Sequence, residues 1–197
     1  AISVAGEIDS VSLSNSTFAE NFGPGSVVVN IPREVTGTVS MTHCSFVDNA
    51  ASAFWGPSSS RIGHCLFARN IPYPGDGSAQ SFVEPGGLIA FDSQGYNLAD
   101  DSPVSLDQAT DIKGQGSLVR VSRLGDFGGK SYSCFPLKGS SAIDGGNPNR
   151  GLLPSRDMRG FSRKARSQFS QNIDNIIDIG AVEVNPEGTI VVSNYDD

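Results

Sequence analysis

Five acidic residues in the second half of the chain are the side chains whose type and spacing could do chemistry. Two arginines accompany them, and the whole set is Asp126, Asp144, Asp157, Asp178, Glu183, Arg159 and Arg163. Paired carboxylates can cleave a glycosidic bond, about 6.5–9.5 Å apart in inverting hydrolases and about 5–5.5 Å apart in retaining ones. Alternatively, acids can hold calcium while an arginine or a lysine abstracts a proton, as in polysaccharide lyases. These two reactions define an enzymatic interpretation, a polysaccharide lyase or a glycoside hydrolase.

A structural interpretation of the same acids competes with the catalytic one, and we favour it. Asp144 lies in AIDGGN and Asp157 in RDMRG, close to glycines where the backbone is expected to turn sharply. Short acidic side chains at turns accept hydrogen bonds from backbone amides, and Arg159 can pair with one of them to tie a long loop down. Asp178 is expected to open a closing strand, DIGAVE. The sequence therefore predicts a structural polar network and no catalytic residue; its members are Asp144, Asp157, Arg159 and Asp178.

The elements that would position these groups are indicated by a repeat in the first half of the chain. The stretches VSLSNSTFAEN (11–21), VSMTHCSFVDN (39–49) and SRIGHCLFARN (60–70) align without gaps, 28 and 21 residues apart. Apolar and polar residues alternate at the start of the pattern, as in a half-buried strand, and a step of three residues then shifts the phase. We interpret this step as a bend between two short strands, with Asn15, His43 and His64 at the corner.

Repeats of this length are typical of coils that cannot bury their apolar faces alone and must stack. Equivalent residues of paired parallel strands lie about 4.8 Å apart, so side chains of one kind would form columns. The sequence therefore predicts an all-β fold, a parallel β-helix solenoid with long loops. Its core ladder is expected to contain an aliphatic column, a phenylalanine column and an asparagine column at the bend: Leu13, Met41 and Ile62; Phe18, Phe46 and Phe67; Asn21, Asn49 and Asn70.

Two aligned His-Cys pairs lie at the bends. Cys44 and Cys65 fall in the same inward column, where buried free thiols are the expected state and a disulfide between neighbouring coils is the alternative. His43 and His64 also align, but their spacing matches no zinc finger or zinc ribbon. We therefore predict stacked corner histidines and no metal site.

The composition of the chain limits its partners. The 197 residues carry a formal net charge of −7 at pH 7, which argues against a nucleic-acid partner. No apolar run approaches the ~20 residues of a membrane-spanning helix. Three aromatic residues are candidates for contact with a carbohydrate, and they are Trp55, Tyr73 and Tyr96.

A series of motifs resembles a known family. GYNL (95–98), LGDFGGKSYSCFPLKGSSAIDGGN (124–147), DMRGFSR (157–163) and DIGAVE (178–183) occur in that order. Together they resemble the C-terminal part of the choice-of-anchor Q domain proteins, β-helix proteins of bacterial surfaces that are similar in their coils to the polymorphic outer-membrane protein repeats. The chain departs from the family pattern at Cys134, where His is usual, and at Ser141, where Pro is usual.

The resemblance implies a right-handed parallel β-helix with a C-terminal capping segment, in a single domain over residues 1–197. Residues 1–98 would hold the coils, 99–184 the family's C-terminal region with long loops, and 185–197 a terminal strand and tail. It also implies a secreted or cell-surface location. We therefore expect a non-catalytic extracellular structural protein, with adhesion or assembly into a fibre as fitting roles. The alternatives are the polysaccharide-active enzyme described above and a carbohydrate-binding module.

The ends of the chain and its surroundings supply the expected partners. AISVAGEI (1–8) and GTIVVSN (188–194) are short apolar stretches outside the repeat pattern. Each could pair within the molecule or add as a strand to a neighbouring copy, head to tail. The second expected partner is a cell-surface or matrix polysaccharide. No cofactor is expected, apart from calcium in the lyase alternative.

Overall fold

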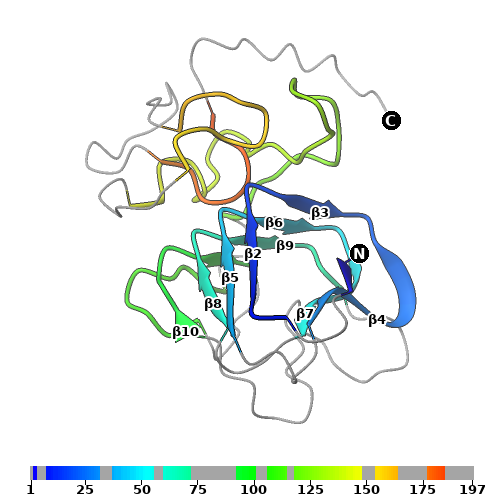
Figure 1. Ribbon diagram of the computed structural model, residues 1–197. Coiled ribbons are helices and arrows are strands. Elements are labelled where there is room, and N and C mark those ends of the chain that lie inside the picture. The colour runs from blue at the N-terminus through cyan, green and yellow to red at the C-terminus, as the bar shows by residue number, and fades with distance from the viewer. Residues whose placement is uncertain are drawn as a thin grey trace.

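The computed structural model describes residues 2–3, 8–31, 37–55, 60–71, 92–100, 106–114, 118–147, 154–163 and 177–184. Within these ranges the chain forms strands and no helix, and so no helix in them is long and apolar enough to cross a membrane. The strands gather in one half of the molecule, and the later segments, yellow to orange in Figure 1, lie in the other half.

Eleven short strands in the described ranges form three separate parallel sheets. The first sheet has the order β1 (Ile2–Ser3), β4 (Phe22–Asn30) and β7 (Ala50–Trp55). The second has the order β10 (Asp92–Ser93), β8 (Arg61–Gly63), β5 (Thr38–Thr42) and β2 (Ser10–Ser14). The third has the order β11 (Leu98–Ala99), β9 (Leu66–Ala68), β6 (Ser45–Val47) and β3 (Thr17–Ala19).

The register of the sheets places equivalent residues of the repeats side by side. In the second sheet Leu13 pairs with Met41, which pairs with Ile62. In the third sheet the rings of Phe18 and Phe46 stack with centroids 4.8 Å apart, and those of Phe46 and Phe67 with centroids 5.1 Å apart. These distances match the spacing of parallel strands, so the stack follows directly from a Phe at the same offset in each repeat.

The step of three residues between paired strands is a tight corner with a left-handed backbone. Asn15, His43, His64 and Tyr96 occupy it with φ between 47° and 58°. A second corner with positive φ follows the next strand, at Glu20, Asp48 and Arg69. Asparagine tolerates this conformation well, whereas histidine and tyrosine adopt it at a cost that the surrounding packing must offset.

An asparagine ladder connects the repeats just after the second corner. Asn49 Nδ2 donates to the carbonyl of Phe18 in the preceding repeat, and Asn70 Nδ2 donates to that of Phe46. Asn49 Oδ1 accepts from the backbone N–H and the side chain of Asn21, at 3.1 and 2.8 Å. Each side-chain amide uses both its donor and its acceptor to bond to a neighbouring repeat. The ladder therefore supplies hydrogen-bond partners for buried polar groups that the short strands do not pair.

Two apolar clusters lie on the two faces of the third sheet. The first cluster lies among the three sheets and takes side chains from each of them, including Val29, Met41 and Phe46. The second lies on the opposite face, where Val47 and Leu66 pack against later residues of the chain such as Val121, Ala142 and Ile179. Strands β6 and β9 are therefore buried on both faces, and the later segments are attached to the sheets through an apolar layer.

The fold corrects the prediction of a right-handed parallel β-helix solenoid. The parallel pairing is divided among three short, separate sheets, and all named strands lie between Ile2 and Ala99. From 106 to 184 the described residues form only isolated bridges: Leu98 with Ile112, Val121 with Pro136, Gly125 with Ser133 and Arg156 with Ser162. The last copy of the repeat ends at residue 70 and the last named strand at Ala99. Columns need equivalent residues at equivalent offsets, and the segments after Ala99 have none.

One smaller expectation also fails. DIGAVE forms no strand: some of its N–H groups bond to side chains, as Ala181 N does to Ser45 Oγ, and others to separate backbone carbonyls, as Ile179 N does to Ala142 O. The terminal stretch 185–197 lies outside the described residues.

Candidate functional site

The segment 177–184 is the centre of the candidate site, and all eight of its residues are buried. It is held against the sheets by its backbone: Gly180 N donates to His64 O at 2.8 Å, and Ala181 N donates to Ser45 Oγ at 2.9 Å. Gly180 has a φ of 104°, and a Cβ there would lie 2.6 Å from Ser45 Oγ. A glycine is therefore required where this segment passes over the third sheet.

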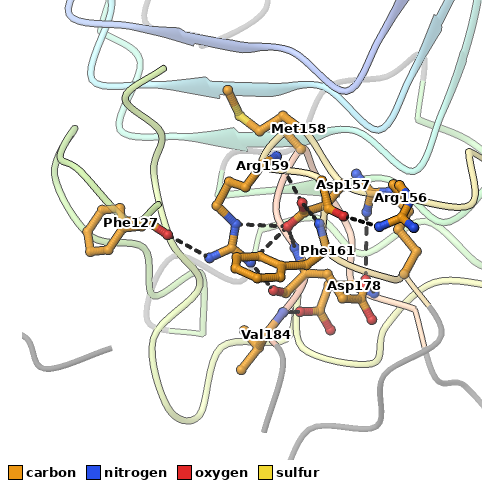
Figure 2. A network of polar contacts seen from close by, with 12 residues as sticks. Phe127, Arg156, Asp157, Met158, Arg159, Phe161, Asp178 and Val184 are labelled. Carbon is orange, nitrogen blue, oxygen red and sulfur yellow. Dashed lines mark hydrogen bonds and ion pairs between the residues drawn. The ribbon is translucent and has the colours of Figure 1, made fainter. Parts of the chain in front are cut away.

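Asp157 and Arg159 form a buried pair that ties three segments together, as Figure 2 shows. Asp157 Oδ1 accepts from the N–H groups of Arg159 and Phe161, and Oδ2 accepts from Arg159 Nε and from the N–H of Glu183. Arg159 donates further to the carbonyls of Phe127 and Glu183. Its guanidinium also lies 4.7 Å from the centroid of the Phe161 ring. The pair therefore joins the segment 154–163 to Phe127 and Glu183 through one buried carboxylate and one buried guanidinium.

Asp178 and Glu183 close the segment into a compact loop. Asp178 Oδ1 accepts from the N–H of Asp144 at 2.7 Å, and Oδ2 accepts from the N–H of Val184 at 2.5 Å. The N–H of Asp178 in turn donates to Glu183 Oε2 at 3.0 Å. Asp144, Asp178 and Glu183 are each fully buried, and one carboxylate oxygen of each lies within 4.8 Å of the other two.

Arg163 connects this acidic cluster to the first corner of the repeats. Its Nη2 donates to Asn15 Oδ1 at 2.6 Å and to Gly180 O at 2.9 Å, and Asn15 Nδ2 donates to the carbonyl of Arg156 at 2.7 Å. Arg163 Nη1 lies 3.7 Å from Glu183 Oε2. The guanidinium is fully buried, so its charge acts on the acids through little water.

The burial of the cluster changes its protonation. Burial raises the pKa of Glu183 to about 10, and the negative charge of Asp178 raises it further than Arg163 lowers it. Burial raises the pKa of Asp178 to about 7 against the opposing hydrogen bonds from Asp144 and Val184. Glu183 therefore carries a proton at neutral pH. Burial also lowers the pKa of Arg163, and the neighbouring acids oppose that shift.

A proton fits this cluster. Backbone N–H groups point at both oxygens of Asp178 and at Oε2 of Glu183, and the Arg163 guanidinium lies beside Glu183. A proton on Glu183 reduces the buried charge without displacing any of these donors.

The corner histidines form a stacked column. The rings of His43 and His64 have centroids 4.6 Å apart, and Tyr96 stacks on His64 at 5.2 Å. His64 Nε2 accepts from the N–H of Asn147, whereas neither ring nitrogen of His43 has a hydrogen-bond partner in the described part of the chain. Burial, and then the charge of Arg163, lower the pKa of His43 far below its usual range. His43 is therefore a neutral ring in the stack.

Cys44 and Cys65 are free and buried beside this column, and Cys134 is free and buried as well. Burial raises the pKa of Cys134 to about 12 and that of Cys65 well above its usual value. A hydrogen bond from Cys65 lowers the pKa of Cys44 against the effect of burial. Cys65 and Cys134 are therefore held as uncharged thiols, poor nucleophiles in an apolar setting.

Of the three residues expected to contact carbohydrate, Tyr96 is the one whose side chain the structure describes. Tyr96 is half-buried and engaged in the histidine stack. Trp55 ends β7, where it pairs with Asn30 in the first sheet. Tyr73 lies outside the described residues.

A surface groove at the second corner was missed by the sequence reasoning. It is lined by Glu20, Phe22, Asp48, Arg69, Ile71 and Arg123, together with Ala50 and Val121, and has a volume of about 550 Å³. Its signal was present in the repeat, because Glu20, Asp48 and Arg69 are the charged residues before each asparagine. The contacts of Arg163 with Asn15 were also missed, since 148 residues separate the two and no spacing indicates the pair.

No family model, curated protein or solved structure matches the chain. The resemblance found in the sequence motifs therefore remains a prediction.

Proposed function

We propose that this chain is a non-catalytic structural protein that works outside the cell or at a cell surface. The proposal rests on how the buried acidic side chains are hydrogen-bonded and protonated. Asp157 is bonded to Arg159 and three backbone N–H groups, and both oxygens of Asp178 accept from backbone N–H groups. Glu183, 0% exposed, is protonated at neutral pH. Carboxyl groups used in this way hold segments together and are poorly placed to reach a substrate.

The alternative, a polysaccharide lyase or a glycoside hydrolase, needs two carboxyl groups that reach one bond of the substrate. Asp144, Asp178 and Glu183 are close enough to each other, but all are covered by the later segments. A general acid or base must come within hydrogen-bond reach of the substrate, and Asp178 and Glu183 already accept hydrogen bonds from the protein's own backbone. The extracellular location is supported by the resemblance of the motifs at residues 95–183 to those of surface proteins.

The proposal is tested by assaying release of reducing ends and of unsaturated products from a panel of neutral and acidic polysaccharides. We expect no turnover from the intact chain. Turnover that Glu183→Gln or Asp178→Asn abolishes, with the circular dichroism spectrum unchanged, would overturn the proposal. Exposed Asp126→Asn is the matched control, because Asp126 lies outside the cluster and accepts one hydrogen bond, from Gly128.

We also propose that the chain associates with itself through the edge formed by β2 and β3. Among the described strands, each of the two has a neighbour on one side only. Val11 and Leu13 in β2 are half-buried, whereas their partners Val39 and Met41 are fully buried. An added strand would cover this edge and satisfy its unpaired backbone groups. At the other end of the third sheet the edge is occupied, since Leu98 bridges to Ile112.

The donor strand that we propose is 188–194, which lies outside the described residues. Light scattering after size exclusion, with and without residues 188–197, measures the mass of the particle. The proposal predicts oligomers of the intact chain and monomers of the shortened one. If both forms are monomeric over a wide range of concentration, head-to-tail association is wrong while the non-catalytic structural role is unaffected.

A further inference from the structure

The groove at the second corner combines an apolar floor with charged walls. Phe22 is 73% exposed and Ile71 is 63% exposed, and with Ala50 they take the position after the asparagine in each of the three repeats. Phe22 pairs with Ala50, and Ile71 N donates to Asn49 O, so the small Ala50 separates the two large exposed side chains along the stack. Large exposed apolar side chains that gather in a groove mark a place where something binds.

One wall of the groove is rigid. Arg69 makes two hydrogen bonds of 2.7 Å to the carboxylate of Asp48, and its other donors reach the carbonyls of Val121 and Ser122. The N–H of Arg69 donates to Asp100. These bonds hold the corner of the third repeat against the segment that begins at 118. The groove is therefore formed before any ligand arrives, which lowers the cost of binding.

Arg123 also lines the groove and brings a positive charge to it. Arg123 is exposed, and its guanidinium makes no hydrogen bond or ion pair in the described part of the chain. Glu20 lines the same groove. The groove thus offers one available guanidinium, one glutamate and an aromatic face within a space of about 550 Å³.

Two backbone donors beneath the groove are already used. Ala50 N donates to Asn21 O, and Ile71 N donates to Asn49 O, both at 2.9 Å. A peptide that binds by adding a strand needs unpaired backbone groups along its path. Stacking on a ring and contacts with side chains do not need these two groups.

We propose that this groove binds an acidic oligosaccharide, with a uronate carboxylate on Arg123 and a sugar ring on Phe22. The C–H face of a pyranose packs on an aromatic ring, and a carboxylate matches the planar fork of a guanidinium. The hydroxyl groups of the sugar donate to the carboxylate of Glu20. This inference goes beyond the structural role proposed above and requires no catalysis, so either can fail without the other.

The experiment is isothermal titration of the intact chain with an oligomer of a hexuronic acid and with the neutral hexose oligomer of the same linkage. We expect binding of the acidic oligomer that weakens at least tenfold in Phe22→Ala and in Arg123→Gln. Arg123→Lys should recover only part of the loss, since lysine lacks the fork. Binding should also weaken as salt is raised.

Tyr132→Ala is the matched control, because Tyr132 is 63% exposed and lies outside the groove. It should leave the affinity unchanged, and a thermal melt of each variant checks that the fold is kept. No binding of either oligomer would overturn the proposal. Equal binding of the two oligomers, or binding that Phe22→Ala and Arg123→Gln leave intact, would also overturn it. Capture of extended peptides at Phe22 without any saccharide would show that the ligand class is wrong.

Discussion

The repeats at residues 10–99 and the segments at 118–184 are stabilised in different ways. In the repeats, columns of like residues stack at the strand spacing, as the rings of Phe18, Phe46 and Phe67 do. In the later segments, no strand is formed in the described residues, and single polar side chains such as Asp157 and Asp178 bind the backbone at several points. The stability of the repeats is shared among many equivalent contacts. The stability of the later segments depends on a few polar side chains, each of which makes contacts that no other residue makes.

Removing Asp157 should have the largest effect. Asp157→Ala leaves the buried guanidinium of Arg159 without its carboxylate and removes the acceptor of three backbone N–H groups, those of Arg159, Phe161 and Glu183. Breaking a buried ion pair from one side costs roughly 3–5 kcal/mol, and we expect a loss near the upper end, about 5 kcal/mol. Urea unfolding measures it, with exposed Asp126→Ala as control at less than about 1 kcal/mol. Equal losses in the two variants would contradict the account.

Phe46→Ala tests the repeats and should cost about 4 kcal/mol, because it removes the middle ring of the stack and leaves a cavity. Hydrogen exchange resolves where each variant opens. Phe46→Ala should speed exchange throughout β5, β6, β8 and β9, whereas Asp157→Ala should act first on 154–163 and 177–184. The same pattern of exchange in both variants would show that the two regions unfold as one.

The asparagine ladder should rank third. Asn49→Ala leaves the carbonyl of Phe18 and the side chain of Asn21 without their partner, at about 2 kcal/mol. Asn49→Asp is the sharper variant, since it keeps the acceptor oxygen but loses the donor and buries a charge. It should be less stable than the alanine variant at pH 7 and recover at pH 4. A ranking that does not change with pH would be inconsistent with a buried side chain at this position.

The pH dependence of the unfolding free energy should further distinguish the later segments from the repeats. Because burial raises the folded-state pKa of Glu183 to about 10, its protonated form contributes stability that is fully present below the unfolded pKa of about 4.5. This stability is lost as the pH rises through about 10, by roughly 1.4 kcal/mol per unit. Glu183→Gln should remove that dependence.

The difference in unfolding free energy between the wild type and Glu183→Gln, measured from pH 5 to pH 9, isolates this group. His43 acts in the opposite direction: its folded-state pKa is lowered, so its contribution is present above the unfolded value of 6.5 and is lost below it. The comparison with Glu183→Gln cancels the His43 contribution. A difference that stays constant across the range would contradict a protonated Glu183.

The smallest effect is expected at the exposed ion pair of Arg61 and Asp92. Its two side chains are 59% and 53% exposed, and the nitrogen and oxygen lie 3.4 Å apart. Arg61→Gln should change stability by less than about 0.5 kcal/mol. A loss as large as that of Asn49→Ala would mean that surface charges, and not columns, hold the second sheet.

The same division explains what the sequence allowed us to predict. The pairing of Leu13 with Met41 could be read from their equal offsets, and the tie of Asp157 to Arg159 from their proximity. The contact of Arg163 with Asn15 could not, because it joins residues 148 positions apart through a single side chain. The overall class was wrong because equal offsets predict which strands pair, but they do not show that the parallel pairing is divided among three short, separate sheets.

The groove at the second corner and the protonation of Glu183 both depend on which side chains are buried, and burial could not be predicted from the sequence. Phe18 and Phe22 are four residues apart in the sequence. Nothing in the sequence around them indicates that Phe18 packs against the core while Phe22 is 73% exposed. Glu183 was grouped with the acids, but its protonated state follows only from the later segments that cover it.

The central claim is that the acids of the later segments serve as buried structural groups. Carbon-13 NMR of the side-chain carboxyl groups, followed from pH 4 to pH 9, measures it directly. We predict that the Glu183 resonance keeps the shift of a protonated carboxyl through pH 8, and that Asp178 titrates near pH 7. Ordinary titration of both groups between pH 3.5 and pH 5 would show solvated carboxylates and contradict the account.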